Sequence, residues 1–421
     1  MSEKNWSGTH EFAASVLHNP TSIDEAQALV AGAERIRALG TRHSFNEIAD
    51  GTELVSLVNV PPELTSDGST VTVTGGTKYA VVANWLQQNG LALHNLGSLP
   101  HISIAGATST ATHGSGSTLG NLSTAIRALE FITPDGSLET IRAGDDDFAG
   151  AAVALGLLGP IARVTLAVQP TYQVRQDVFI GLEFSALLDH VHEVFDAGYS
   201  VSVFTDWVSH TGSIWVKTRM DVSGSVPDEI FGAKRESERR NILEGNDNMT
   251  LQGGVPGPWS ERLPHFRIDA TPSDGDEIQT EYMVPITDAA AALSAVHQIA
   301  AEFAPILLVT ELRTVASDDL WLSTAYGRHT LCIHFTWKNL PEAVHAILPL
   351  IESALAPFAA RPHWGKVNQV HSSTIATLYE KLPDFRRLVE RRDPSFKFRN
   401  DYLRELLGLR DKPRGSASYA R

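Results

Sequence analysis

Two sets of residues in this chain have the types and spacing for chemistry, and they lie far apart in the sequence. The first is residues 95–116, NLGSLPHISIAGATSTATHGSG, which carry almost no charge and are rich in Gly, Ala, Ser and Thr. Such small side chains bury too little apolar surface to build a core. They do allow backbone N–H groups and hydroxyls to approach a flat or phosphorylated ligand closely. The segment therefore indicates a ligand-binding site or, alternatively, a tight loop between two elements.

The second set lies on three segments whose residues alternate in the manner of β-strands. In 330–337 the odd positions are apolar and the even positions can form hydrogen bonds, and 309–315 and 278–284 also carry polar residues on one face. The alternative is that these polar faces meet water. Nearby aromatic residues, and Lys366 after HWG at 363–365, favour a pocket instead. If the faces coincide, one space receives Gln279, Glu311, Arg313, His334 and Thr336.

Length and composition describe an ordinary globular protein. At 421 residues the chain exceeds the ~250–300 at which a single core stops growing, so two domains are expected. The net charge of −15 argues against nucleic acid or an anionic membrane as partner. No run approaches the ~18 apolar residues of a membrane span. Cys332 is the only cysteine, which excludes an intrachain disulfide and predicts a reducing, cytoplasmic location.

Hydrophobic periodicity and capping residues predict an α+β arrangement in the first part of the chain. Its expected helices run from a Ser22–Glu25 capping box to Gly32, and over 79–89 and 148–155. Its expected strands are 34–39, 54–57, 71–74, 125–133, 138–142 and 161–168.

From residue 172 the pattern predicts a single antiparallel sheet with helices on one face. The expected strands are 201–208, 214–220, 278–284, 309–315 and 330–337, and the expected helices are 182–197, 289–303 and 341–355. After residue 366, helices are expected over 375–382, 385–390 and 402–409, followed by a tail without regular structure.

The motifs of several other enzyme classes are missing from the sequence. There is no Walker loop, His-Glu-x-x-His or paired Cys-x-x-Cys, so phosphate-loop hydrolases are not indicated and no metal site is expected. Gly114-x-Gly116 lacks the spacing and the strand-to-helix context of the dinucleotide fingerprint. The Gly-x-Ser-x-Gly turn of serine hydrolases is also absent from a suitable setting.

Residues 39–46, LGTRHSFN, place a histidine directly after a glycine turn. Together with 95–116 they resemble the flavin-binding domain of the vanillyl-alcohol oxidase family, and within that family the chain is similar to the alditol oxidases. Because the matching words run in order over most of the chain, the resemblance is more specific than any single glycine motif. The further words are LPHIS at 99–103, THGSG at 112–116, GPW at 257–259, RLPHF at 262–266, ELRTV at 311–315, HFTW at 334–337 and HWGK at 363–366.

The resemblance implies a two-domain FAD-binding fold. A flavin domain is expected from residues 1–171 and 369–421, and an antiparallel-sheet substrate cap from residues 172–368. FAD would lie between them, with its pyrophosphate on small-residue turns at 40–44 and 106–116.

The resemblance also implies that His43 is joined covalently to the flavin; a structural histidine is the alternative. Strand alternation would aim the side chain of Arg42 away from the flavin. By motif match the implied cofactor-binding residues are Gly40, Thr41, Arg42, His43, Ser44, Ser98, Ser103, Gly106, Thr110, Thr112, His113, Gly114, Ile161 and His363.

The implied reaction is oxidation of the terminal CH2OH of an alditol, such as xylitol or sorbitol, to the aldose. Hydride would pass from C1 to flavin N5, and O2 would be reduced to H2O2. Gly97 has no Cβ and would leave room for O2, or it would instead serve a turn with φ > 0. By motif match the implied substrate ligands are Ser98, Gln279, Glu311, Arg313, His334, Thr336 and Lys366.

The implied catalytic residues are Lys366, Arg313 and Glu311, and Lys366 is the first choice for the base. Its pKa would have to fall by roughly 3 from its usual ~10.4, which burial and the Arg313 cation could supply. Glu311 and His334 are the rivals. The partners expected are the polyol and O2, and the protein is expected to be a monomer. Two other functions remain open: an aldonolactone oxidase or dehydrogenase of the same family, and a carbohydrate-binding protein without catalysis.

Overall fold

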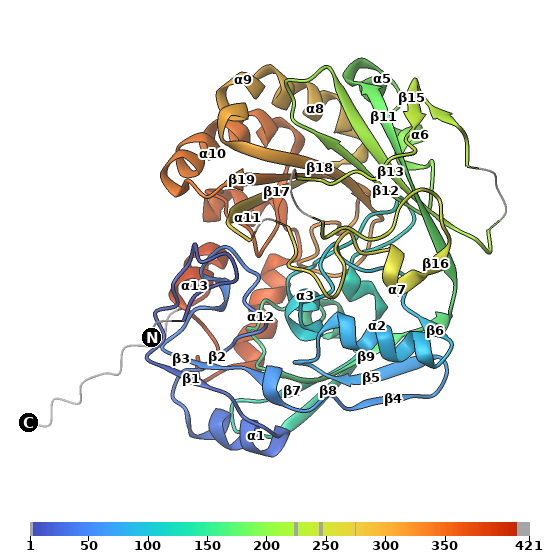
Figure 1. Cartoon of the computed structure of the whole chain (residues 1–421). Coiled ribbons are helices and arrows are strands. Elements are labelled where there is room, and N and C mark those ends of the chain that lie inside the picture. The colour runs from blue at the N-terminus through green and yellow to red at the C-terminus, as the bar shows by residue number, and fades with distance from the viewer. Residues whose placement is uncertain (1–2, 223–225, 244–246, 274, 411–421) are drawn as a thin grey trace, which may run out of the picture.

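The computed structural model describes residues 3–222, 226–243, 247–273 and 275–410. The expected tail at 411–421 lies outside the described residues. Two layered regions are visible, one in the lower half and one in the upper half of Figure 1. Among the described residues no single helix is long and apolar enough to cross a membrane, although one bent pair, 286–298 with 300–306, passes a test of length and composition.

The lower region contains both ends of the described chain. A five-stranded antiparallel sheet has the order β4-β5-β9-β7-β8, and a small parallel sheet has the order β1-β3-β2. The strands are β1 (Val16–His18), β2 (Arg37–Ala38), β3 (Glu53–Val55), β4 (Leu64–Ser66), β5 (Thr70–Thr74), β6 (Leu91–Ala92), β7 (Ile126–Ile132), β8 (Leu138–Arg142), β9 (Ile161–Ala167) and β10 (Gln169–Pro170). The helices are α1 (Ile23–Gly32), α2 (Tyr79–Gln88), α3 (Ile104–Ser109), α4 (Phe148–Ala151), α11 (Ser372–Leu378), α12 (Leu382–Arg392) and α13 (Asp401–Leu407).

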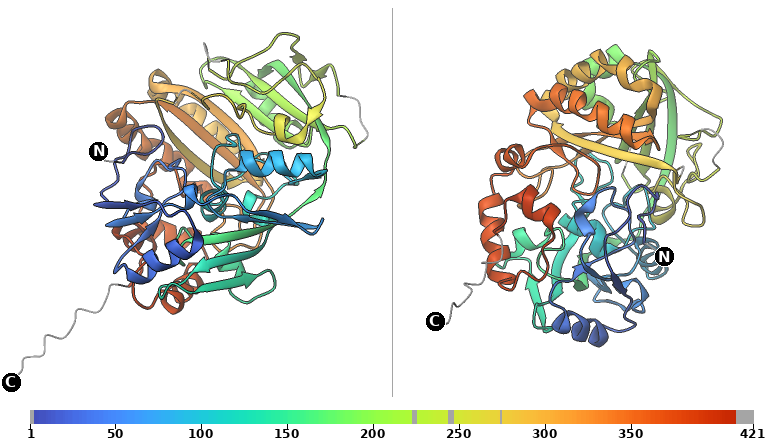
Figure 2. Two further views of the ribbon diagram at one scale, coloured as in Figure 1. Left: turned by 60° about the horizontal axis from the view of Figure 1, so that its bottom comes forward. Right: turned by 90° about the vertical axis from the view of Figure 1, so that its left-hand side faces the viewer.

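The C-terminal helices share one core with the N-terminal elements. Phe385 and Leu388 of α12, and Leu403 of α13, belong to the same buried cluster as Leu129 of β7 and Val164 of β9. Figure 2 shows these red helices on the same side of the molecule as the blue N-terminal elements. The chain therefore leaves the lower region after β10 and returns to it after β20.

The upper region is one long antiparallel sheet with the strand order β14-β15-β11-β13-β12-β18-β19-β17-β20. We call this sheet the cap sheet. Its strands are β11 (Gln173–Glu183), β12 (Ser200–Thr205), β13 (Thr211–Arg219), β14 (Glu229–Ile230), β15 (Ala233–Arg235), β16 (Gly257–Pro258, beside β11), β17 (Glu277–Pro285), β18 (Leu307–Val315), β19 (Thr330–Lys338) and β20 (Arg361–Pro362). Its helices are α5 (Phe184–Asp189), α6 (Val191–Phe195), α7 (Trp259–Arg262), α8 (Ala289–Gln298), α9 (Ala300–Phe303) and α10 (Pro341–Leu355).

One face of the cap sheet is covered by helices, as the sequence predicts. Ile333, Phe335 and Trp337 of β19 lie in one buried cluster with Leu293 of α8 and Leu348 of α10. The rings of Phe335 and Trp337 stack with centroids 5.1 Å apart. The apolar half of the alternation thus forms the core of the cap, and its polar half must face the lower region.

Some expected elements are shorter in the structure: the helix expected over 148–155 ends at Ala151, and the strand expected over 34–39 is limited to Arg37–Ala38. Two further expectations are wrong. The expected helix over 182–197 begins two residues later, because Leu182 and Glu183 pair with Gly212 and Thr211 at the end of the β11–β13 ladder. The expected turns from residue 106 onward begin as a helix, since 104–109 form α3. In both places tertiary contacts outweigh local propensity.

Candidate active site

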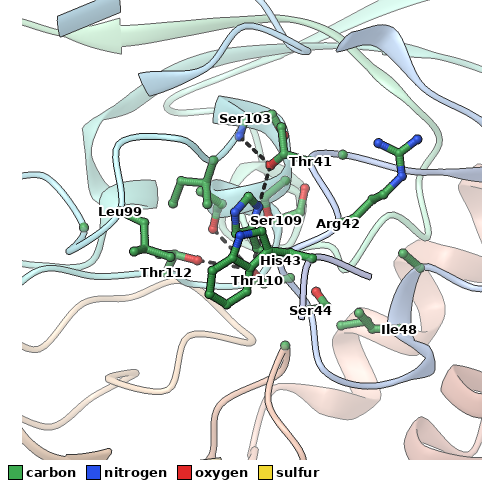
Figure 3. Close-up of a pocket in the computed structure, with 18 of the residues that line it drawn as sticks. Thr41, Arg42, His43, Ser44, Ile48, Leu99, Ser103, Ser109, Thr110 and Thr112 are labelled. Carbon is green, nitrogen blue, oxygen red and sulfur yellow. Dashed lines mark hydrogen bonds between the residues drawn. The ribbon is translucent and has the colours of Figure 1, made fainter. Parts of the chain in front are cut away.

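The loop at 39–46 holds the His43 side chain against its neighbours. Thr41 Oγ1 accepts a hydrogen bond from the Ser103 N–H at 3.1 Å and lies 3.1 Å from His43 Nδ1. The indole of Trp6 stacks on the imidazole with centroids 5.6 Å apart. Figure 3 shows the Thr41–Ser103 and Thr41–His43 contacts as dashed lines. The other ring nitrogen, His43 Nε2, is buried and has no hydrogen-bond partner in the described part of the chain.

The imidazole of His43 is neutral at physiological pH. Burial, helped by the cation of Lys366, lowers the pKa of His43 to about 3. A neutral ring with one buried, unpaired nitrogen carries a free lone pair, which is what a nucleophile needs.

The side chain of Arg42 points away from His43. The sequence predicts this direction from strand alternation, but the structure reaches it in another way. The backbone of Arg42 is in the left-handed region with φ 64°, so residue 42 is not part of a strand. The guanidinium Nε lies 2.6 Å from Glu3 Oε1, and Figure 3 shows the side chain extending away from the imidazole.

The small residues at 95–116 allow two segments to approach each other closely. A Cβ on Gly40 or on Gly106 would lie 2.8 or 2.9 Å from Ser103 Oγ, so glycine at both positions lets α3 pack against the 39–46 loop without displacing the Ser103 hydroxyl. Gly114 has a different role and does not line the pocket. A Cβ on this residue would lie 2.5 Å from Asn95 Oδ1, so its absence makes room for the Asn95 side chain.

The polar face of the cap sheet is buried, so the alternative that it meets water is wrong. The strand register aligns Phe204 of β12, Glu311 of β18, His334 of β19 and Glu281 of β17 in one row across the sheet. Thr336 and Gln279 are direct partners on the same face, two residues along their strands from His334 and Glu281. Polar groups from non-consecutive strands therefore meet in one place.

Glu281, which the sequence reasoning missed, is at the centre of this face. Its Oε1 accepts a hydrogen bond from Arg313 Nη2 at 2.7 Å and lies 3.2 Å from His113 Nε2, while Oε2 lies 3.3 Å from His334 Nδ1. Burial favours the neutral acid, but Arg313, His113 and His334 together hold the pKa of Glu281 well below its usual range. Its position two residues after Gln279, on the same face of the strand, was the available signal.

Two residues that the sequence reasoning also missed contact Glu311, and a third, Lys217, contacts one of them. Glu311 Oε1 accepts from Ser202 Oγ at 2.9 Å and lies 2.8 Å from His265 Nε2. Lys217 Nζ lies 3.3 Å from the other nitrogen of that imidazole. Burial opposes ionisation, but Arg313 and His265 hold the pKa of Glu311 well below its usual range.

The segment 363–366 brings Lys366 to the same space. The Phe45 N–H donates to Gly365 O at 2.8 Å, and Asn46 Nδ2 donates to Lys366 O at 2.9 Å, so this segment is bound to the loop that carries His43. Lys366 Nζ donates to Gln279 Oε1 and lies 4.9 Å from the centre of the Phe45 ring. Burial lowers the pKa of Lys366 to about 8, against the opposing effect of Glu281.

One pocket brings the predicted residues together. Every residue implied as a cofactor or substrate ligand lines this pocket except Gly114. Glu281 and His265 line it too. Ser202 and Lys217 are not among its lining residues and lie behind Glu311.

The residues present fit the FAD that the resemblance implies. Among the lining residues that the structure describes, the only two carboxylates, Glu281 and Glu311, are on the cap sheet, so a diphosphate on the opposite side meets hydroxyls and backbone N–H groups. The unpaired Nε2 of His43 is available in the same space. The lining also includes apolar side chains that suit a flat ring, among them Val55, Leu57, Leu155 and Ile161.

The chain is similar over almost its whole length to two curated enzymes. It is 43% identical over 413 residues to the alditol oxidase of Streptomyces sp. (strain IKD472 / FERM P-14339), a match that covers 96% of this chain and 98% of the relative. It is 32% identical over 433 residues to the L-gulono-1,4-lactone dehydrogenase of Mycobacterium tuberculosis (strain ATCC 25618 / H37Rv), with the same coverage.

Family models and solved structures agree with this similarity. A model described as FAD binding domain matches residues 14–142, and one described as D-arabinono-1,4-lactone oxidase matches residues 275–406. The crystal structure of cholesterol oxidase from B. sterolicum has the same fold, with a TM-score of 0.78 and 14% identity over 96% of both chains. The chain therefore belongs to the vanillyl-alcohol oxidase family of FAD-linked oxidases.

Proposed function

We propose that this protein oxidises the terminal primary alcohol of an alditol, such as xylitol or sorbitol, to the aldose with O2 as acceptor. Residues 1–171 and 369–421 would form the FAD-binding domain, and residues 172–368 the substrate cap. When bound, the flavin accepts the two electrons removed from the alcohol carbon and passes them to O2, which becomes H2O2.

The observation that carries this proposal is the buried polar face of the cap sheet. A chain of hydroxyl groups needs several donors and acceptors, because each unpaired buried partner costs about 1–3 kcal/mol. The row containing Glu311, His334 and Glu281 supplies these groups, together with Gln279 and Lys366 beside it. The similarity to an alditol oxidase supports the same substrate class.

Among the candidate bases, Lys366 is best suited to accept the hydroxyl proton. Its pKa of about 8 leaves a substantial fraction of neutral amine near neutral pH. Glu311 is a weaker base because its pKa is held well below its usual range. His334 lies beside Glu281, and burial lowers its pKa.

We also propose that His43 binds the flavin covalently and through a single bond. The support is the neutral imidazole with its buried, unpaired Nε2 in the pocket. Cys332, the only cysteine, is buried on β19 among Met283, Val315 and Ala325 and does not line the pocket. A second, cysteinyl link is therefore not expected.

An aldonolactone oxidoreductase is the second candidate. It is favoured by the match of residues 275–406 to the D-arabinono-1,4-lactone oxidase model and by the 32% identity to a lactone dehydrogenase.

The two functions can be separated by mixing the purified yellow protein anaerobically with xylitol, sorbitol, L-gulono-1,4-lactone or D-arabinono-1,4-lactone and following the flavin absorbance. We expect the alditols to bleach the flavin much faster than the lactones, and a peroxidase-coupled assay to detect H2O2 when air is admitted. Faster bleaching by a lactone would favour the second candidate. A protein that binds polyols but contains no flavin would contradict both.

A further inference from the structure

A buried chain of polar groups behind Glu311 is not used in the chemistry proposed above. His265 follows α7, and its Nε2 lies 2.8 Å from Glu311 Oε1. Its Nδ1 lies 3.3 Å from the Nζ of Lys217 on β13. The Lys217 side chain is only 2% exposed, and burial lowers the pKa of its amine to about 7, so an ionisable group has been placed inside the protein at considerable cost. Such a cost calls for a role.

The order of these groups fixes the direction of the hydrogen bonds. The ionised carboxylate of Glu311 can only accept, so His265 Nε2 must donate to it, and Nδ1 of a singly protonated ring is left to accept from Lys217. Burial, assisted by the Lys217 cation, lowers the pKa of His265 to about 4, and the ring therefore carries a single proton. That proton must be on Nε2, from which it is donated to Glu311 Oε1. Lys217, as a donor to Nδ1, thus supports the tautomer of His265 that binds the carboxylate.

The same contacts determine which oxygen of Glu311 is available. Oε1 receives hydrogen bonds from His265 and from Ser202 Oγ. Oε2 has no protein partner in the described part of the chain. Because Glu311 lines the pocket, this second oxygen is left to accept a hydrogen bond from a substrate hydroxyl.

Lys217 also holds the backbone segment that carries His265. Its Nζ donates to Leu263 O. Phe266, the residue after His265, donates its N–H to Ser98 O at 3.2 Å. The rings of Phe204 and Trp215 contact the imidazole edge-on, with centroids 5.6 and 5.7 Å away. One segment therefore connects two proposed substrate ligands, Glu311 and Ser98, and its position depends on Lys217.

We propose that Lys217 and His265 are positioning residues for substrate recognition. They occupy Oε1 of Glu311 and present Oε2 to a hydroxyl of the polyol. This inference rests on the proposed oxidation of alditols. It adds to it two residues that act through Glu311, of which Lys217 does not line the pocket.

The test compares four variants by anaerobic reduction of the flavin over a range of xylitol concentrations. Lys217→Met keeps the aliphatic stem without the donor, and His265→Leu removes the donor to Glu311. His265→Gln places an amide N–H near the position of Nε2 and so restores that donor. Lys234→Met changes an exposed lysine of β15 on the same sheet and serves as the control.

We expect Lys217→Met and His265→Leu to raise the half-saturating xylitol concentration about tenfold or more, as for the loss of a hydrogen bond to a charged group. The limiting rate of reduction should fall less. His265→Gln should return to within a few-fold of wild type, and Lys234→Met should equal wild type. The flavin absorbance per protein confirms that each variant is folded. If Lys217→Met does not hold flavin, the comparison of His265→Leu with His265→Gln alone decides the outcome.

Two results would overturn the inference while leaving the proposed function intact. One is an unchanged half-saturating concentration in yellow His265→Leu protein. The other is a His265→Gln variant as impaired as His265→Leu, which would show that the residue only fills space. A wild-type protein whose flavin no alditol reduces would instead contradict the proposed function, and this inference with it.

Discussion

Arg313 on β18 reaches across β19 to donate a hydrogen bond to Glu281 on β17, with 2.7 Å between Nη2 and Oε1. The same guanidinium lies 3.7 Å from Glu311 Oε1, so one buried cation is shared by two buried carboxylates. Arg313 Nη1 is 3.4 Å from Ser98 Oγ, at the opposite wall of the pocket. Against the opposing effect of burial, Cys332 and Glu281 raise the pKa of His113 to about 10, so His113 is a second cation beside Glu281. Removing one carboxylate therefore leaves an uncompensated positive charge in a region of low dielectric.

Glu281→Gln should therefore destabilise the protein by about 3 kcal/mol, because Arg313 loses the charge that compensates its burial. Urea unfolding followed by intrinsic fluorescence measures this change. Glu302→Gln, at an exposed position on α9, should alter stability by less than about 0.5 kcal/mol. Equal midpoints for the two variants would show that Arg313 is compensated by Glu311 alone.

The rate of flavin reduction by xylitol should rise with pH and level off above about 8, because the base must be the neutral amine of Lys366. Lys366→Met should slow reduction about 10²–10⁴-fold and abolish this rise while keeping the flavin. Anaerobic stopped-flow across pH 6–10 gives the profile, with Lys234→Met as the control. A Lys366→Met protein with the wild-type profile would move the role of base to another group.

The yellow colour should survive acid precipitation in the wild type and be lost to the supernatant in His43→Ala, because the covalent bond requires the imidazole. His101→Ala is the matched control, since its Nε2 instead lies 2.9 Å from Ile268 O. Acid-stable colour in His43→Ala would place the attachment elsewhere.

Gly97→Ala and Gly97→Val should slow reoxidation of the reduced flavin by O2 in that order, with less effect on reduction by xylitol. The alternative of a φ > 0 turn is wrong, since Gly97 is not among the glycines with positive φ. An added Cβ would meet His113 O and Thr112 Cγ2 at 3.7 Å, which is ordinary contact, so the loop accepts alanine without strain. Stopped flow measures the two half-reactions separately. Unchanged reoxidation in folded Gly97→Val would indicate another route for O2.

The sequence by itself determined the parts of this protein that depend on local periodicity and on small residues. The period of two along a strand assigned His334 and Thr336 to one face and Phe335 and Trp337 to the other, and the structure has both faces as expected. The glycine turn before His43 likewise indicated the loop that lines the pocket.

Only the tertiary structure decided which strands are neighbours. Strand order in a sheet follows from long-range packing, and alternation within one strand carries no information about it. Because β12 lies beside β18, and β13 beside β12, Ser202 and Lys217 approach Glu311 from more than ninety residues away in the sequence. Gly114 was misjudged because only the folded loop shows that its missing Cβ makes room for Asn95 and Leu96 and not for the pocket. Side-chain periodicity thus determined which residues face the site, and strand pairing determined which of them meet there.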